Sequence, residues 1–249
     1  MDAKEFETSF KVEETYWWFV GQQFLVREFL QKNYSGQKNL HLLDIGCGTG
    51  ITLSILSRHG KAQGMDVSDE AVRFCRKRGF SIAKGDVAKM PFPDDSFDIV
   101  TCLGVFYHEG VKDDLKGFQE IKRVLKPEGR LLFMDCAMPS LYGKHDLAFH
   151  GIRRYTKKDL AAKMQQAGLR IERLNYYNFA LFFPVYLKRK LEKLSKAAPK
   201  SEVSAEINPL LNTMLKKMYL AELRLLRYIS YPVGINVLAV GKKEMIKKI

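Results

Sequence analysis

The sequence predicts an α/β protein with a parallel sheet, and three observations support this. Short apolar runs alternate with longer amphipathic segments through the middle of the chain, which is typical of strands connected by helices. Glycine occupies every second position from Gly46 to Gly50, directly after an apolar run, and marks a sharp turn from a strand into a helix. The composition, 46% hydrophobic and 28% charged over 249 residues, is that of a globular protein with a substantial core.

Seven apolar runs are bounded by turn residues and are predicted to form strands: residues 40–45, 62–66, 80–84, 97–103, 130–135, 169–175 and 234–241. Amphipathic segments between them predict helices at residues 51–59, 69–78, 112–125 and 157–167. The last helix has clear ends, because Thr156 can cap its N-terminus and Gly168 can close its C-terminus. Residues 176–233 are too many for a hairpin loop, and we expect two helices there.

The glycine loop predicts a nucleotide-type pocket. Its glycines are one residue apart, whereas a dinucleotide-binding loop has two residues before its third glycine. Asp44, at the end of the first predicted strand, would repel a phosphate but would suit an ammonium group. Asp66 follows Gly46 by 20 residues, ends the second predicted strand and can accept both hydroxyl groups of a ribose. The pattern therefore weakens the case for a pyrophosphate ligand.

Five ordered motifs resemble those of class I S-adenosylmethionine-dependent methyltransferases: residues 44–50, Asp66, and residues 85–87, 97–103 and 124–130. The resemblance implies a Rossmann-like, seven-stranded, mostly parallel sheet with an antiparallel last strand and a helical insertion before that strand. It also implies S-adenosyl-L-methionine as cofactor and S-adenosyl-L-homocysteine as product. Within this class the chain is similar to a bacterial, methyltransferase type 11-like subgroup with an N-terminal aromatic lid and a C-terminal helical cap.

The same resemblance implies a division of the chain and a set of cofactor contacts. The lid covers residues 1–39, the cofactor-binding core 40–175, the cap 176–233, and the last strand with a basic tail 234–249. The methionine portion is expected on Asp44, Gly46, Cys47, Gly48 and Gly50. The ribose is expected on Asp66, the adenine on Asp86 and Val87, and apolar walls at Val67 and Leu103. The alternatives are a helix-capping role for Asp66 and a turn role for Asp86.

Two histidines are candidate catalytic residues. His108 follows the fourth predicted strand, where the family places residues that face the transferred methyl group, and Tyr107 beside it is a candidate substrate contact. With an ordinary pKa of about 6.5, His108 can serve as a general base. Packing against the cofactor is the equal alternative. His145 precedes Asp146 in a His-Asp pair that resembles a subgroup motif, and we expect both residues to contact the substrate.

Residues 150–156, His-Gly-Ile-Arg-Arg-Tyr-Thr, resemble a Gly-His-Arg-Arg-Arg-Tyr-Thr string of that subgroup. His150 stands one place earlier than its counterpart, and Ile152 replaces an arginine, so no role is transferred to His150. Arg153 or Arg154 can bind a carboxylate or a phosphate, with a solvated loop as the equal alternative. We take Arg153 as the candidate substrate contact.

Both tryptophans of the chain, Trp17 and Trp18, lie in the expected lid. In the subgroup, aromatic residues at this place cover the cofactor and the acceptor, so both are candidate substrate contacts. Core packing of an amphipathic helix is the alternative. Because adjacent side chains cannot both face one core, we expect at least one tryptophan in the pocket or in an interface.

Aromatic residues also gather in the expected cap, at residues 176–187, directly before Lys188, Arg189 and Lys190. An aromatic face beside cations suits a helix that lies on an anionic bilayer. Packing on the sheet or on a twin subunit is the alternative. Of the net charge of +13, residues 186–249 contribute +9, with 14 Lys and Arg against 5 Asp and Glu. This basic quarter would attract membrane lipids, nucleic acid or acidic substrates.

The sequence favours a cytoplasmic location. Peripheral contact with a membrane through the basic cap is an additional interpretation that the sequence leaves open. No run approaches the roughly 20 apolar residues of a spanning helix. The first residues are polar and lack the apolar run of a secretory signal. The four cysteines, Cys47, Cys75, Cys102 and Cys136, show no metal-ligand spacing and are expected to be reduced.

Together these observations predict a methyltransferase that acts on a small or lipid-linked acceptor. RNA methylation is an alternative suggested by the basic C-terminal quarter, although the Asn-Pro-Pro-Tyr motif of such enzymes is absent after the fourth predicted strand. A non-catalytic S-adenosylmethionine-binding protein is another alternative, because cofactor binding and turnover need different residues. The oligomeric state is left open.

Overall fold

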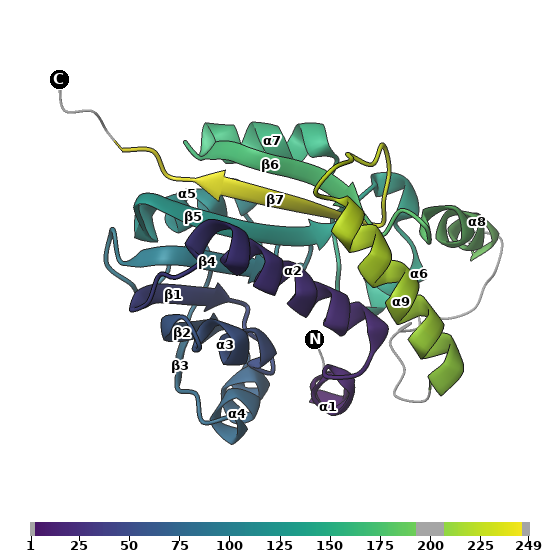
Figure 1. Cartoon of the computed structure of the whole chain (residues 1–249), viewed down its shortest axis with the longest axis horizontal. Coiled ribbons are helices and arrows are strands. Elements are labelled where there is room, and N and C mark those ends of the chain that lie inside the picture. The colour runs from purple at the N-terminus through teal and green to yellow at the C-terminus, as the bar shows by residue number, and fades with distance from the viewer. Residues whose placement is uncertain (1–2, 193–206, 246–249) are drawn as a thin grey trace.

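A seven-stranded sheet in the order β3-β2-β1-β4-β5-β7-β6 forms the centre of the protein (Figure 1). The computed structural model describes residues 3–192 and 207–245. The strands are β1 (Leu40–Ile45), β2 (Gly60–Asp66), β3 (Ile82–Lys84), β4 (Phe97–Leu103), β5 (Leu125–Cys136), β6 (Arg170–Tyr177) and β7 (Asn236–Lys242). Strand β7 runs antiparallel to both β5 and β6, whereas β1 to β5 are parallel. The predicted fold class is confirmed.

Helices cover both faces of the sheet. Helices α2 (Trp17–Tyr34), α3 (Ile51–Leu56) and α9 (Pro209–Leu225) lie on one face, and α5 (Asp114–Val124) and α7 (Lys157–Gln166) lie on the other (Figure 1). The remaining helices are α1 (Ala3–Val12), α4 (Asp69–Lys77), η1 (Pro139–Leu141), α6 (Lys144–Ala148) and α8 (Phe182–Glu192). Among the described residues, no helix is long and apolar enough to cross a membrane.

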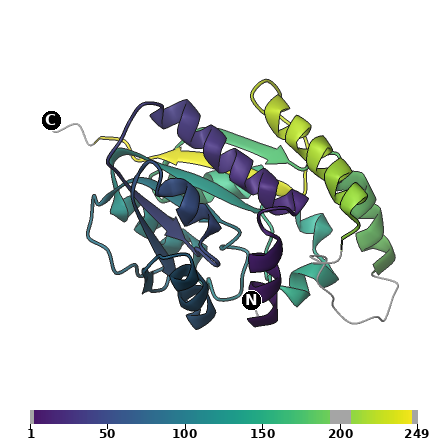
Figure 2. The same cartoon turned by 60° about the horizontal axis from the view of Figure 1, so that its bottom comes forward.

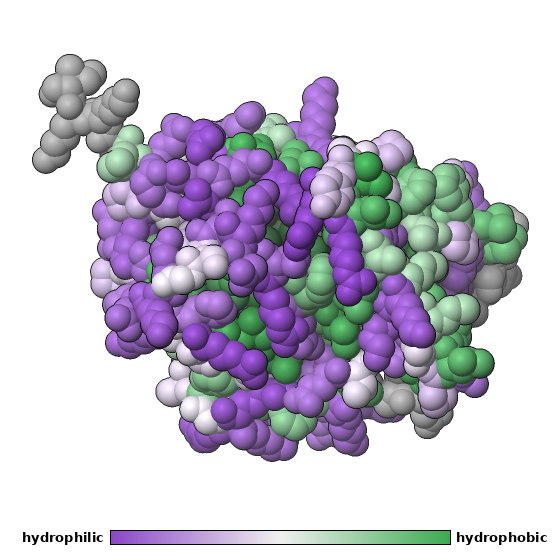
Figure 3. Space-filling model, viewed as in Figure 1, coloured by the Kyte–Doolittle hydropathy of each residue, from purple (hydrophilic) through white to green (hydrophobic). Residues whose placement is uncertain are grey.

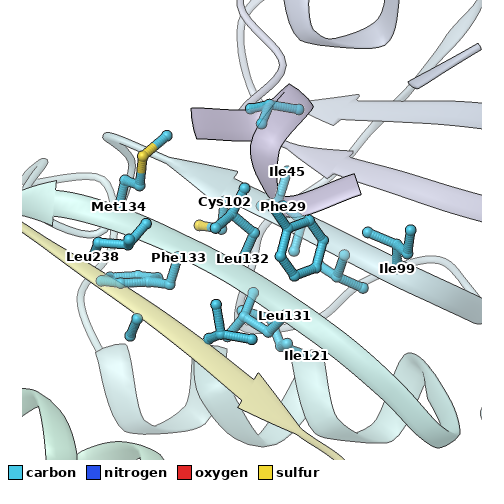
Figure 4. Close-up of a cluster of buried hydrophobic side chains, with 14 of the residues drawn as sticks. Phe29, Ile45, Ile99, Cys102, Ile121, Leu131, Leu132, Phe133, Met134 and Leu238 are labelled. Carbon is cyan, nitrogen blue, oxygen red and sulfur yellow. The ribbon is translucent and has the colours of Figure 1, made fainter. Parts of the chain in front are cut away.

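The core explains why the central strands are continuous apolar runs. Figure 4 shows Phe29 of α2 and Ile121 of α5 on opposite sides of β4 and β5. Residues such as Leu132 and Phe133, which are neighbours and point to opposite faces, are both buried. A sheet covered on both faces selects apolar side chains at nearly every position of its central strands.

Strand β5 begins five residues earlier than the sequence predicts. The pairing of β4 with β5 shifts between Phe97 and Ile99, so that residues 126–129 form a bulge between two paired stretches. Glu128 in this bulge has a positive φ of 68°. The Pro-Glu-Gly sequence at 127–129 looks like the end of a helix and a loop, whereas the structure places it within an irregular strand.

Helix α9 is fixed against α2 by residues that lie 195 to 199 positions apart in the sequence. The side-chain amide of Asn212 accepts a hydrogen bond from the Trp17 N–H at 2.9 Å and donates to the Thr15 carbonyl at 3.0 Å. Asn212 thereby satisfies a backbone group at the start of α2, where the preceding Tyr16 provides no side-chain cap. Further along α2, Glu28 pairs with Arg227, which follows α9. Helices α2 and α9 therefore form one unit (Figure 2).

Candidate active site

A cavity of about 370 Å³ opens at the carboxyl ends of β1, β4 and β5. Parallel α/β sheets bind ligands at this edge, where the strand order reverses. The lid side of the cavity carries Glu13, Tyr16, Trp17, Trp18 and Phe19. The glycine-loop side carries Asp44, Gly46, Cys47, Gly48 and Thr49, and the far side carries Tyr107, Asp135, His145, Arg154 and Asn236.

The glycine loop has a backbone that residues with a side chain rarely adopt. Gly46, Gly48 and Gly50 have φ angles of 63°, 53° and 84°. A Cβ at Gly46 would lie 2.4 Å from a methyl carbon of Val105. Both the Gly46 and Cys47 N–H groups donate to the Met65 carbonyl, at 2.8 and 3.2 Å. The loop is therefore folded tightly between the ends of β1 and β2, where only glycine fits at position 46.

Asp44 presents a buried carboxyl group to the cavity beside this loop. Only 3% of its surface is exposed, and the Thr101 hydroxyl donates a hydrogen bond to it at 2.6 Å. Burial raises the pKa of Asp44 to about 7, and the hydrogen bond from Thr101 opposes this shift. A cationic ligand group strongly stabilises the ionised form of a buried carboxylate. An ammonium group is such a cation.

Asp66 holds the glycine loop from the end of β2. Its carboxylate accepts hydrogen bonds from the Gly48 and Ser68 N–H groups, each at 3.0 Å. Burial raises its pKa, and these backbone hydrogen bonds oppose the rise. Asp66 is adjacent to the cavity but does not line it. The structure thus ties Asp66 to the loop, and the expected ribose contact stays a prediction.

The residues expected at the adenine lie outside the cavity. Asp86 is exposed and accepts a hydrogen bond from the Ala88 N–H at 2.8 Å, which is a turn interaction, while Val87 is buried beneath it. Val67 is largely exposed. Gly50 is the N-cap of α3 and does not line the cavity either, whereas Leu103 does.

Asp135 is a second buried acid in the cavity, and sequence reasoning gave it no role. It lies near the end of β5 and accepts hydrogen bonds from the N–H groups of Phe106 and Tyr107, at 2.9 and 3.2 Å. Burial raises the pKa of Asp135 to about 7. Its bonds fix the loop after β4, which directs Tyr107 into the cavity lining. The available signal was an acid that ends an apolar strand, as at Asp44.

Asn236, at the start of β7, was also missed. It lines the cavity and is 4% exposed, and its side-chain oxygen has no hydrogen-bond partner among the described residues. Buried polar atoms in proteins are almost always hydrogen-bonded. Its backbone pairs with Cys136, the neighbour of Asp135, so both acceptors come from adjoining strands. The Asn236 oxygen can therefore accept from a ligand that carries an N–H or O–H group, beside Asp135, whose two carboxylate oxygens already accept hydrogen bonds from backbone N–H groups.

The His-Asp pair separates into two roles. His145 in α6 lines the cavity, with its ring 4.8 Å from that of Phe149. Asp146 also borders the cavity, but its carboxylate is engaged by the Arg154 guanidinium at 2.7 Å and by the Gly143 N–H at 2.8 Å. Both partners of this ion pair are almost completely buried. The pair fixes α6 to the segment that follows it.

His108 and Arg153 lie outside the cavity. The Nδ1 atom of His108 accepts a hydrogen bond from the Gly110 N–H at 3.0 Å, and its ring centre is 5.8 Å from that of His150. Burial lowers the pKa of His108. Arg153 donates to the Val111 carbonyl at 2.7 Å, and its neighbour Arg154 is the arginine that lines the cavity. The roles expected for His108 and Arg153 are not supported by contact with the cavity.

The N-terminal lid is attached to the glycine loop by Glu13. Its buried carboxylate accepts hydrogen bonds from the Thr49 hydroxyl and the Arg78 guanidinium, and Arg78 also donates to the Thr49 carbonyl at 3.0 Å. Trp17 and Trp18 both line the cavity on one side. On the other side both pack against Tyr219 of α9, with ring centres 5.2 and 5.9 Å away. The two tryptophans therefore belong to a pocket wall and to a helix interface together.

The fold and the glycine loop agree with the class I S-adenosylmethionine-dependent methyltransferases that the sequence resembles. Residues 43–133 match the family described as "Methyltransferase domain", and the chain carries a domain of this family. The "Probable tRNA methyltransferase 9B" of Mus musculus is 32% identical over 143 residues, which cover 57% of this chain and 29% of that protein. The demethylmenaquinone methyltransferase of Staphylococcus aureus is 32% identical over 124 residues, 46% of this chain and 51% of that protein.

Solved structures show the same fold over most of the chain. The Bacillus subtilis YcgJ protein superposes with a TM-score of 0.57 at 20% identity, covering 90% of this chain and 100% of that one. The [4+2]-cyclase SpnF superposes with a TM-score of 0.59 at 18% identity, covering 90% and 81%. By contrast, the chain spans only about a quarter to a half of the length of the curated relatives named above.

The pKa of Asp44 predicts a pH dependence for the binding of S-adenosylmethionine. Because the ammonium group is expected to bind the ionised carboxylate, affinity should rise with pH up to about 7. The change should approach tenfold per pH unit between about pH 5.5 and 6.5, where an α-amino group stays protonated. Isothermal titration calorimetry across this range measures it.

Two variants identify the group that titrates. Asp44→Asn should bind weakly and show a flat profile, whereas Asp135→Asn should retain the slope, although burial raises both pKa values to about 7. A flat profile for the unmodified protein, or one flattened only by Asp135→Asn, would contradict the assignment of Asp44 to the ammonium group.

Proposed function

We propose that this protein binds S-adenosyl-L-methionine and transfers its methyl group to a small or lipid-linked acceptor. The observation that carries the proposal is one cavity that joins the glycine loop and Asp44 to a second set of polar groups behind an aromatic lid. The bound cofactor would supply an activated methyl group on a sulfonium. The protein would place an acceptor beside it and exclude water.

The glycine-loop half of the cavity fits the cofactor. A backbone that has no room for a Cβ at Gly46 allows close approach, and the buried carboxylate of Asp44 complements an ammonium group. We assign the methionine portion to this half, and the ribose and adenine to the adjoining Asp66 and to Asp86 with Val87. Asp66 would have to accept ribose hydroxyls while it retains its bonds to the loop.

The far half of the cavity indicates what the acceptor looks like. Asn236 and Asp135 present oxygen atoms to an N–H or O–H group of the acceptor. Tyr177, Leu181 and Val185 line the same region and suit an apolar body. His145 is the imidazole at this wall, and we propose it, rather than His108, as the group that could take a proton from an acceptor.

RNA is a second candidate acceptor. It is favoured by the similarity to proteins named as tRNA methyltransferases and by the basic C-terminal quarter. A protein that binds the cofactor without methyl transfer is a third, because SpnF, described as a cyclase, has the same fold.

Labelled methyl transfer separates these functions. The purified protein is incubated with methyl-tritiated S-adenosylmethionine and a bacterial extract, which is then divided into lipid-soluble, small aqueous, RNA and protein fractions. We expect label in one of the first two fractions, and none above background with Asp44→Asn. Label in the RNA fraction would show that the acceptor is RNA rather than a small or lipid-linked molecule. No label in any fraction would overturn the proposal of methyl transfer.

A further inference from the structure

The outer face of α8 is apolar and exposed. Phe183, Leu187 and Leu191 are spaced by four residues, so they form one ridge along the helix, and they are 62%, 61% and 58% exposed. On the opposite side of the helix, Phe182 and Arg189 are buried against the protein. Packing of the helix on its own sheet, one of the two sequence interpretations, therefore accounts for only its inner side.

The first turns of α9 extend this apolar surface. Leu210, Leu211 and Met214 are 80%, 44% and 58% exposed. Both helices lie at the same end of the molecule (Figures 1 and 2), and hydrophobic side chains gather there on the face seen in Figure 3. We call these residues, with the α8 ridge, the α8–α9 apolar surface. Exposed apolar side chains gathered at one end of a molecule in this way mark an interaction site.

Positive charge borders the α8–α9 apolar surface. Apart from the buried Arg189, helices α8 and α9 carry five basic residues, Lys188, Lys190, Lys216, Lys217 and Arg224, against two acidic ones. The acids are engaged internally: Glu192 pairs with Arg189, and buried Glu222 accepts hydrogen bonds from the Phe179 and Ala180 N–H groups. The rim of the surface is therefore cationic.

We propose that the α8–α9 apolar surface docks this protein on the surface of an anionic lipid bilayer. Apolar side chains enter the boundary between headgroups and acyl chains, and the surrounding lysines attract lipid phosphates. A second copy of the chain is a poorer partner, because a two-fold contact would place the same cationic rim against itself. A bilayer supplies both the apolar phase and the opposite charge.

Helix α8 then separates the bilayer from the cavity. Its inner residues Val185 and Arg189 line the cavity, and its outer ridge contacts lipid. An acceptor with an apolar chain would reach Asn236 and Asp135 from the membrane side. This consequence rests on the proposed methyl transfer, whereas the docking does not.

Vesicle flotation of the full chain tests the docking. We expect flotation with vesicles of phosphatidylcholine and phosphatidylglycerol, and little with phosphatidylcholine alone. Leu187→Gln should lower the partition coefficient about tenfold, because one ridge side chain no longer enters the apolar phase. The double variant Lys188→Gln/Lys190→Gln should lower it by about fivefold or more.

Met245→Gln is the matched control, because Met245 is also exposed, at 64%, and lies outside the two helices. It should float like the unmodified protein, and circular dichroism should show that all variants are folded. No flotation with the anionic vesicles, or equal flotation of Leu187→Gln and Met245→Gln, would overturn the proposal. A Leu187-dependent dimer without lipid binding would assign the surface to a second copy. S-adenosylmethionine binding measured without vesicles tests the proposed function separately.

Discussion

Replacing Asp146 by alanine should lower the free energy of unfolding by about 3–5 kcal/mol, the cost of breaking a buried ion pair by removing one partner. The loss would leave the Arg154 guanidinium buried, with its remaining hydrogen bond to the Ala137 carbonyl at 2.9 Å. It would also remove the acceptor of the Gly143 N–H at the start of α6. Urea unfolding followed by circular dichroism measures the change.

Two controls test whether the loss of stability comes from the unpaired buried charge: a double variant, and a variant that breaks an exposed ion pair. Asp146→Ala/Arg154→Met should recover part of the loss, because no unpaired charge stays buried. Glu244→Ala breaks an exposed pair with Arg170 and should cost about 0–1 kcal/mol. An Asp146→Ala protein as stable as Glu244→Ala, but with reduced methyl transfer, would return Asp146 to the substrate contact expected from sequence.

The sheet was predictable because its central strands are buried on both faces. For β1 and β4 the predicted and observed bounds agree, since a continuous apolar run ends where the backbone leaves the covered sheet. The ends of β5 were less predictable, because the bulge around Glu128 places polar residues within the strand. Strand order and the antiparallel β7 came from the family resemblance rather than from any local pattern.

The cofactor half of the site was more predictable than the acceptor half. Asp44 and the glycine loop are contiguous in sequence, so spacing alone brings them together. Asn236 lies about 100 residues after Asp135, and only the pairing of β5 with β7 makes them neighbours. Which of Arg153 and Arg154 lines the cavity depends on the local backbone, which turns at His150 with a φ of 52°. No sequence periodicity indicates that turn.

Removing the charge of Glu13 should speed the release of the proposed cofactor by loosening the lid. The Glu13 carboxylate joins the lid to the glycine loop through Thr49 and to the end of α4 through Arg78. Arg78 is the residue that directly follows α4. Burial raises the pKa of Glu13, and the bonds from Thr49 and Arg78 favour its ionised form. A hydrogen bond between charged partners contributes about 1.5–3 kcal/mol, which corresponds to about 10- to 100-fold in a rate or equilibrium constant. Glu13→Gln keeps the size of the side chain and removes its charge.

We therefore expect Glu13→Gln to release S-adenosylmethionine about 10- to 100-fold faster than the unmodified protein, because the lid opens more often. Trp17 and Trp18 are the two tryptophans of the chain and both line the cavity, so stopped-flow tryptophan fluorescence reports the release directly. Glu14→Gln is the control: its carboxylate is 71% exposed and 3.6 Å from the same arginine, so its loss should change little. Equal release rates for the two variants would show that the lid is held by the packing of α2 on α9 rather than by Glu13.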